Sequence, residues 1–214
     1  MNAQTISIVS LVLSLINLGL VAYLAWVNYL SPMNLRVSTS VLTLRPQLEN
    51  KSMQLHAVLT ILLCNEGARG GFVEDIALRF RSEDGVTNWL YQPWYFIDYG
   101  EFLRIQLSHQ RDVEAIKTQF HPIWVPGKQA ITETIIFGPE VGNPDFPIGK
   151  LSPAKFYIDI ITRDSASCHW TIQKTISYNL KGRTLESLVK GSTTFDLTDL
   201  GEARKKIKPD RIVE

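Results

Sequence analysis

Residues 59–80, LTILLCNEGARGGFVEDIALRF, contain two strand patterns separated by a turn. Apolar side chains alternate with other residues on both sides of the turn, at Leu59, Ile61, Leu63, Ile76, Leu78 and Phe80. A period of two is typical of strands that bury one face. The central run CNEGARGG supplies asparagine and glycine, which tolerate the positive φ angles that a chain reversal needs. This stretch therefore predicts an antiparallel β fold.

The same alternation recurs after residue 35, with glycine, proline and asparagine between the segments. The predicted strands lie near residues 35–41, 55–63, 76–80, 103–107, 131–137, 156–161 and 170–178. Short helices are predicted only at Asp112–Gln119 and Leu197–Lys206. Seven or more half-buried strands indicate an all-β fold, here one antiparallel β-sandwich over residues 35–197.

A second turn lies in residues 121–137, HPIWVPGKQAITETIIF, which read as an extended segment, a Pro-Gly turn and a strand. This turn and the Asn65-x-Gly67 turn together resemble those of immunoglobulin-like sandwiches in bacterial surface and membrane-anchored proteins. The whole chain is similar to uncharacterised bacterial single-pass membrane proteins with such a domain. The resemblance covers roughly residues 35–197 and implies a fold but no activity. Cys64 and Cys168 lie too far apart in the sequence for the Cys-Trp-Cys core of antibody domains.

The N-terminal segment is strongly apolar, and Arg36 is the first charged side chain in the chain. Ile6–Val27 contains 22 residues without a charge. A helix of this length spans about 33 Å, which matches a hydrocarbon core of about 30 Å. Tyr23, Trp26 and Tyr29 gather at its C-terminal end, where an aromatic belt is expected. We therefore predict a transmembrane helix over residues 6–30, in contact with the lipid bilayer, after a short tail of residues 1–5.

A cleaved signal peptide is the alternative interpretation of this segment. The N-terminal MNAQT contains no lysine or arginine, the apolar run is long, and the residues after Ala25 are a poor cleavage site. Arg36 and Arg45 follow the span, whereas only the α-amino group precedes it, so the positive-inside rule favours a cytoplasmic C-terminal domain. We expect a single-pass protein of a bacterial inner membrane.

Polar residues repeat along the predicted span at a heptad-like spacing, namely Ser7, Ser10, Ser14 and Asn17. This spacing places them on one helix face, where small and polar residues can support contact with a second membrane helix. The alternative is that the serines bond back to the preceding turn of their own helix. Both interpretations remain open from the sequence.

The densest aromatic region is WLYQPWYFIDYGEF, residues 89–102, which holds seven of the chain's 21 aromatic residues. Its alternation is poor, so we expect some rings to reach the surface. The candidate binding platform comprises Trp89, Tyr91, Trp94, Tyr95 and Tyr99. Exposed rings of this kind bind glycans, peptides or interfacial lipid. The alternative is a large hydrophobic corner of the sandwich.

Few residues point to catalysis or metal binding. The net charge of +1 argues against a nucleic-acid partner. His56, His109, His121 and His169 are scattered, and no metal-ligand spacing, P-loop or nucleophile elbow is present. We therefore predict no cofactor, metal or small-molecule substrate. The loop with Glu140, Asn143 and Asp145 could hold Ca²⁺ but is better read as an ordinary surface loop. Residues 198–214 form a charged C-terminal tail.

These observations favour a non-enzymatic, membrane-anchored interaction or scaffold protein that binds another protein or a second copy of itself. Two alternatives stay open. One is a membrane-tethered hydrolase, which would need distant residues such as Cys168 and His121 to converge. The other is a glycan-binding module of the cell envelope.

Overall fold

The computed structural model describes the backbone of residues 3–49, 52–82, 88–108, 115–139, 155–165, 169–179, 193–196 and 205–206. The helices are α1 (Ala3–Ala25), its π-helical continuation η1 (Trp26–Leu30), and α2 (Tyr99–Ser108). The strands are β1 (Leu35–Glu49), β2 (Ser52–Asn65), β3 (Gly71–Ser82), β4 (Asn88–Ile97), β5 (Ile116–Gln119), β6 (Ile123–Val125), β7 (Ala130–Pro139), β8 (Lys155–Asp164), β9 (Trp170–Asn179), β10 (Thr193–Asp196) and β11 (Lys205–Lys206). We call the strands together with α2 the β-domain.

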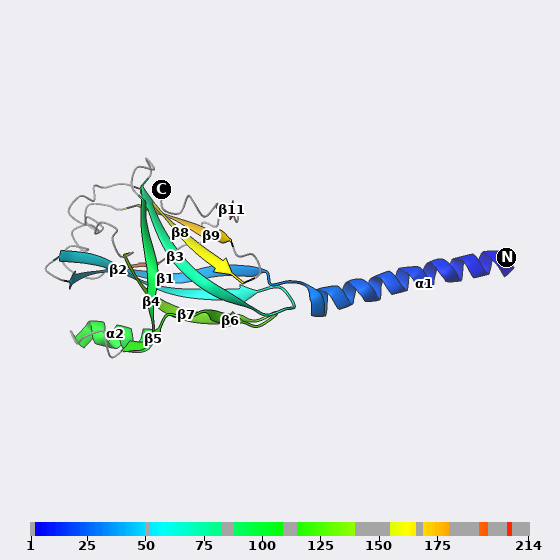
Figure 1. Cartoon of the computed structure of the whole chain (residues 1–214), viewed down its shortest axis with the longest axis horizontal. Coiled ribbons are helices and arrows are strands. Elements are labelled where there is room, and N and C mark those ends of the chain that lie inside the picture. Colours follow the sequence, from blue (N-terminus) through cyan, green and yellow to red (C-terminus); the bar gives the residue numbers. More distant parts are fainter. Residues whose placement is uncertain are drawn as a thin grey trace.

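All described strands belong to one antiparallel sheet, in the order β10-β1-β2-β7-β4-β3-β8-β9-β11. Two short strands lie off this path, because β5 pairs with β4 and β6 pairs with β3. The sheet curls until Cα atoms of β1 and β9 approach within 8 Å, so it is nearly barrel-shaped (Figure 1). The antiparallel β fold expected from the sequence is thus confirmed. An immunoglobulin-like sandwich of two separate sheets is not confirmed.

The interior of the barrel is apolar because every second side chain of the central strands points inward. In β2, Ala57, Leu59, Ile61 and Leu63 are all buried, as the alternation predicts. A second, smaller cluster lies on the outer face beneath α2 and comprises Val58, Ile97, Phe102, Ala115 and Ile136. The barrel wall is therefore packed on both faces where α2 covers it.

The prediction of a strand at residues 103–107 is wrong, because this segment lies in α2. The Oδ1 atom of Asp98 accepts a hydrogen bond from the backbone N–H of Glu101 at 3.1 Å, which caps the start of the helix. Phe102 is buried against the outer face of the sheet. Burial of Phe102 and the Asp98 cap stabilise the helix. An alternation of five residues is too short to distinguish a strand from such a helix.

The two predicted helices are also wrong where the structure describes them. Ile116–Gln119 is strand β5, and Lys205–Lys206 is strand β11. Residues 112–114 and 197–204 of these predictions lie outside the described residues. β5 pairs with the edge of β4, so tertiary pairing overrides the local helical pattern.

The N-terminal helix projects from one end of the β-domain (Figure 1). Ile8–Leu30 forms a helix of 23 residues with a mean hydropathy of 2.3, long and apolar enough to cross a membrane. Most of its large apolar side chains are exposed, and its contact with the β-domain lies at its C-terminal end, where Lys128 binds Asn28. We call the end of the β-domain from which the helix leaves the basal end, and the opposite end, where α2 lies, the distal end.

Candidate functional site

The barrel wall opens between β6 and β7. Two strands share one edge of β3, since β4 pairs with residues 78–81 and β6 with residues 71–73. Residues 135–139 of β7 pair with β4, but among the described strands residues 130–134 pair only with β2. The facing edge of β6 likewise has no strand partner in the described part of the chain. We call this opening between β6 and β7 the seam.

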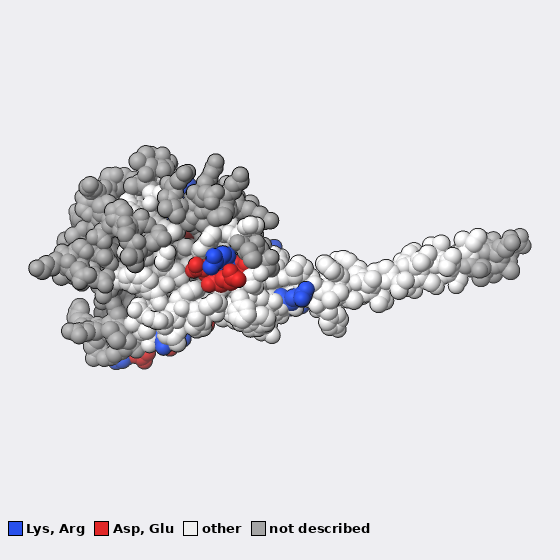
Figure 2. All heavy atoms as spheres, in the orientation of Figure 1, with Lys and Arg blue, Asp and Glu red and all other residues white. Residues whose placement is uncertain are grey.

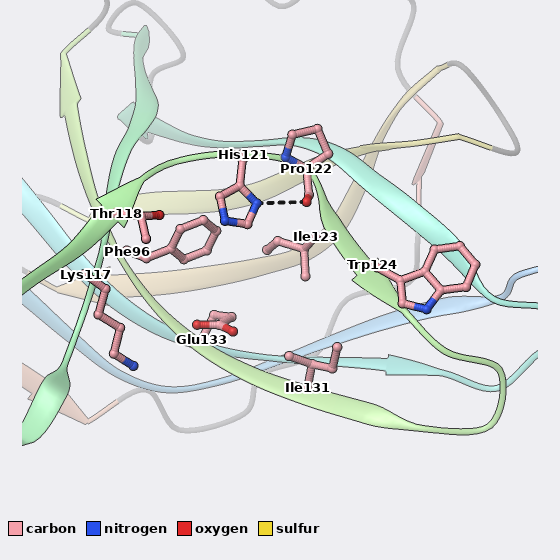
Figure 3. A pocket seen from close by; sticks show the side chains of 9 residues that line it. All are labelled: Phe96, Lys117, Thr118, His121, Pro122, Ile123, Trp124, Ile131 and Glu133. Atoms are coloured by element: carbon pink, nitrogen blue, oxygen red, sulfur yellow. Dashed lines mark hydrogen bonds between the residues drawn. The ribbon is translucent and has the colours of Figure 1, made fainter.

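A cavity of about 410 Å³ occupies the seam (Figure 3). Its lining residues come from four strands and the β5–β6 connection, and they are Phe96, Lys117, Thr118, His121, Pro122, Ile123, Trp124, Ile131 and Glu133. This volume is near the lower end of the range for small ligand pockets. The cavity can hold a few side chains of a partner or a small amphipathic molecule.

The floor of the cavity is continuous with the hydrophobic core. Phe96 and Ile123 are buried core residues, and Ile131 packs against the same cluster. The Phe96 ring stacks on Phe120, with centroids 5.3 Å apart, and contacts the His121 ring at 5.0 Å. The floor is therefore held both by packing in the core and by ring contacts with the β5–β6 connection.

Charged side chains lie beside this apolar floor. Glu133 shares a strand face with Ile131 and the core residue Ile135, so its half-buried carboxylate points into the seam (Figure 3). Within the described residues, neither Glu133 nor Lys117 forms an ion pair or a side-chain hydrogen bond. An unpaired charge beside apolar surface is a group that a ligand of opposite charge can bind.

His121, Glu133 and Lys117 are the residues of the cavity lining that could take part in acid–base chemistry. The Nδ1 atom of His121 lies 3.1 Å from the carbonyl oxygen of Pro122, which orients the ring. Among the described residues, no group of three or more His, Cys, Asp or Glu side chains is arranged to hold a metal ion. The apolar floor and the charges of Glu133 and Lys117 suit this cavity to binding by apolar contact and charge.

The basal end of the seam is fixed by Asn65, which is fully buried. Its Oδ1 atom accepts hydrogen bonds from the backbone N–H groups of Asn34 and Gly67, at 3.1 and 2.9 Å. Its Nδ2 group donates to the carbonyl oxygens of Arg69, at 2.9 Å, and Pro126, at 3.2 Å. One side chain therefore joins the segment after η1, the β2–β3 turn and the β6–β7 turn.

Glycine is required in both of these turns because the backbones approach very closely. A Cβ atom on Gly67 would lie 1.9 Å from the carbonyl oxygen of Pro32. A Cβ atom on Gly127 would lie 1.9 Å from the carbonyl oxygen of Ala68. The predicted chain reversals at Asn65–Gly67 and Pro126–Gly127 are confirmed, although neither forms a simple hairpin.

The aromatic residues expected to form a binding platform are divided between two environments. Trp89 and Tyr91 are buried in the core, whereas Trp94, Tyr95 and Tyr99 are half-buried. Trp94 packs edge-on against His56, with ring centroids 4.9 Å apart. Whether the half-buried rings bind a ligand stays a prediction. Phe96, which lies in the same stretch but was not among the predicted platform residues, lines the cavity of the seam.

The polar stripe of α1 stays a prediction as well. Ser10, Ser14 and Asn17 are exposed on the helix, and the side chain of Ser7 lies outside the described residues. The Oγ atom of Ser14 donates a hydrogen bond to the carbonyl oxygen of Ser10 at 2.9 Å. For Ser14, this bond matches the alternative in which serines bond to their own helix.

Most of the remaining candidates cannot be placed. Cys168, His109 and the loop with Glu140, Asn143 and Asp145 lie outside the described residues. Cys64 is a half-buried free thiol at the end of β2. The pairing of Cys168 with His121 that a hydrolase would need therefore stays a prediction.

Three of the cavity-lining residues, Trp124, Ile131 and Glu133, lie in the quoted stretch HPIWVPGKQAITETIIF, but they were not singled out from the sequence as site candidates. The position of Glu133 on the inward parity of β7 was the available signal, since a charge among Ile131, Ile135 and Phe137 interrupts the apolar face. No protein-family model matches the chain, and no curated protein shows significant similarity to it.

Proposed function

We propose that this chain is a membrane-anchored, non-enzymatic binding protein whose seam accepts an extended segment of a partner protein. The open edge of β7 is the observation that carries the proposal. Residues 130–134 pair on one side with β2, and the cavity of about 410 Å³ lies against their other side. An extended peptide can add a strand to such an edge through main-chain hydrogen bonds.

Side chains around the open edge would give the binding its specificity. Phe96, Ile123 and Ile131 offer apolar contacts, which favour a partner segment with alternating aliphatic residues. Glu133 and Lys117 add charges of opposite sign. A partner segment with one basic and one acidic residue flanking its apolar positions would pair with both.

The anchor is α1 together with η1. Its length and hydropathy, and the aromatic residues Tyr23, Trp26 and Tyr29 at its C-terminal end, support a single span of a bacterial inner membrane. Arg36 and Arg45 favour a cytoplasmic β-domain. The full-length chain should sediment with membranes and resist carbonate extraction. Recovery of a shorter chain lacking residues 1–25 in the soluble fraction would instead identify a cleaved signal peptide.

The binding proposal is tested by selecting phage-displayed random peptides on the full-length chain in lipid nanodiscs. We expect enriched peptides to be strand-forming and to contain a basic residue that contacts Glu133. The Glu133→Lys variant should weaken them about tenfold or more, as loss of a close charge pair does. Exchanging the basic residue of the peptide for glutamate should restore binding to that variant.

Thr132 provides a matched control, because it is the exposed neighbour of Glu133 on the opposite face of β7. Thr132→Lys introduces the same charge one residue away and should leave peptide binding unchanged. Bound peptide should also slow amide hydrogen exchange in residues 130–134. Enriched peptides that bind wild-type and Glu133→Lys proteins equally would overturn the proposal. Saturable binding of an oligosaccharide that requires Trp124 would favour the envelope glycan-binding alternative.

A further inference from the structure

The basal end of the β-domain has an exposed aromatic pair next to basic residues. Phe72 is 44% exposed and Trp124 is 48% exposed, and their rings meet edge to face with centroids 4.9 Å apart. Arg69 and Lys128 lie in the two turns beside them, and both are exposed. We call these four residues the basal face. A small basic patch is visible where the helix meets the domain (Figure 2).

The basal face is tied directly to the end of the helix. The carbonyl oxygen of Ser31 accepts a hydrogen bond from the backbone N–H of Arg69 at 3.0 Å, and its Oγ accepts one from the N–H of Ala68 at 2.8 Å. The Nζ atom of Lys128 donates to Oδ1 of Asn28 at 2.7 Å. Because η1 ends at Leu30 and β1 begins at Leu35, only four residues connect helix and domain.

These bonds fix the height of the basal face relative to the helix. Trp26 and Tyr29 are the aromatic residues expected at the level of the lipid headgroups. Ser31 lies about one helical turn beyond Trp26, since its backbone N–H donates to the carbonyl oxygen of Trp26 at 2.8 Å. The Trp124 ring lies against Gly70, the neighbour of Arg69, since a Cβ atom on Gly70 would approach it to 2.4 Å. Trp124 is therefore close to the headgroup level.

Arg69 and Lys128 give the basal face two positive charges, whereas Glu74 and Asp75, farther along β3, are paired with Arg163 at 3.3 and 4.0 Å. Arg36 is paired with Glu66 at 2.8 Å, so these two charges compensate each other. The partner of Lys128 is the neutral Asn28, and Arg69 has no ion pair within the described residues. Two positive charges are thus left beside two exposed rings, the combination that binds the headgroup layer of anionic membranes.

We infer that the basal face docks on the lipid headgroups of the bilayer that α1 spans, with Phe72 and Trp124 inserted at the interface. This inference rests on the membrane anchor in the proposed function. Docking holds the β-domain against the bilayer at a fixed height. It places the basal rim of the seam, formed by Trp124, at the membrane surface.

The test uses the full-length chain labelled with 5-fluorotryptophan, in nanodiscs of mixed zwitterionic and anionic lipid that contain a gadolinium-chelating headgroup. The ¹⁹F resonance of each tryptophan is assigned by single Trp→Phe replacement. Trp89 is the distal reference, because its partner Phe80 lies eight residues from Phe72 along β3, or about 26 Å. We expect the Trp26 and Trp124 resonances to broaden several-fold more than that of Trp89.

The same spectrum separates the two proposals. A broadened Trp26 with a Trp124 resonance as narrow as that of Trp89 overturns the docking but leaves the anchor intact. A narrow Trp26 resonance shows that α1 is not in the bilayer and overturns both.

Two variants test the named residues. The double variant Phe72→Ser with Arg69→Ser should reduce the broadening of Trp124 several-fold and leave that of Trp26 unchanged. The control Leu103→Ser removes an exposed apolar side chain from α2 at the distal end and should change neither resonance. Equal broadening of Trp124 in wild type and in the double variant overturns the role of these residues.

Discussion

Charged side chains are paired on one side of the barrel wall and unpaired, within the described residues, on the other. Across β3, β8 and β9 the wall is continuous, and its buried acid Asp159 is fully paired. At the seam the wall is open, and Glu133 and Lys117 have no partner among the described residues. In the continuous wall the charges pair with one another and stabilise the fold, whereas at the seam they line the cavity in which we propose that a partner segment binds.

Asp159 is the centre of the continuous wall. Its Oδ2 atom accepts hydrogen bonds from Nη2 of Arg79 at 2.6 Å and Nε of Arg81 at 2.7 Å. Its Oδ1 atom accepts bonds from Nη2 of Arg81 at 3.0 Å and Oγ1 of Thr175 at 2.7 Å. Three neighbouring strands are therefore joined by one carboxylate that has no exposed surface.

The largest expected effect comes from removing this carboxylate. Asp159→Ala removes the buried carboxylate that Arg79 and Arg81 both bind, and we expect a loss of about 3–5 kcal/mol in unfolding free energy. Urea unfolding of the full-length chain in mild detergent measures it. The control Glu101→Ala breaks the exposed pair with Arg104, whose atoms lie 2.7 Å apart, and should cost less than about 1 kcal/mol. Equal losses in the two variants would contradict the comparison.

A smaller loss is expected at the base of the seam. Asn65→Ala removes the side chain that joins the β2–β3 and β6–β7 turns and leaves several buried backbone groups unpaired, at a cost of about 2–4 kcal/mol. Because the turns also position β6 against β7, peptide binding in the seam should weaken in the same variant. Asn34→Ala, which removes one exposed bond to Glu66, is the control. A variant as stable as wild type would show that the turns hold without Asn65.

Lowering the pH should reduce the contribution of Asp159 to the free energy of unfolding. Burial raises the pKa of this carboxyl, but hydrogen bonds from Arg81, Thr175 and Arg79 outweigh burial, and the pKa lies below its ordinary value of 3.8. A group with a lowered pKa in the folded state stabilises fully above its unfolded pKa, and this stabilisation is lost as the pH falls toward the folded-state pKa.

We therefore expect the stability difference between wild type and Asp159→Ala to be constant from about pH 5 to 8 and to shrink below about pH 4. Urea unfolding at a series of pH values measures this difference. A difference that persists unchanged at about pH 2 would contradict the assignment.

The smallest effect on stability is expected in the seam. Glu133→Gln removes an unpaired charge and should change the unfolding free energy by less than about 0.5 kcal/mol. Peptide affinity should nevertheless fall, because the partner's basic residue loses its counter-charge. A loss of stability comparable to that of Asp159→Ala would show that Glu133 supports the fold rather than a ligand.

Local patterns predicted the strands well where alternation is long. The inward residues of β2 and the alternation at Ile76, Leu78 and Phe80 are confirmed as core positions. The strand predicted from the five-residue alternation around Leu103 was wrong, because the same residues form a helix that buries Phe102 and is capped by Asp98. The aromatic segment 89–102 contains one residue that lines the cavity, Phe96. The five residues predicted to form a binding platform are not among the lining residues.

The sequence alone determined the apolar N-terminal helix, the strand-rich domain and the two glycine turns, because each depends on neighbouring residues. Only the tertiary structure decided that the strands form one curled sheet and that its wall opens beside β7. β2 lies beside β7, and β3 lies beside β8, so the decisive hydrogen bonds join residues far apart in the chain. The alternation of a strand defines which side chains share a face, but it does not specify which strand becomes its neighbour.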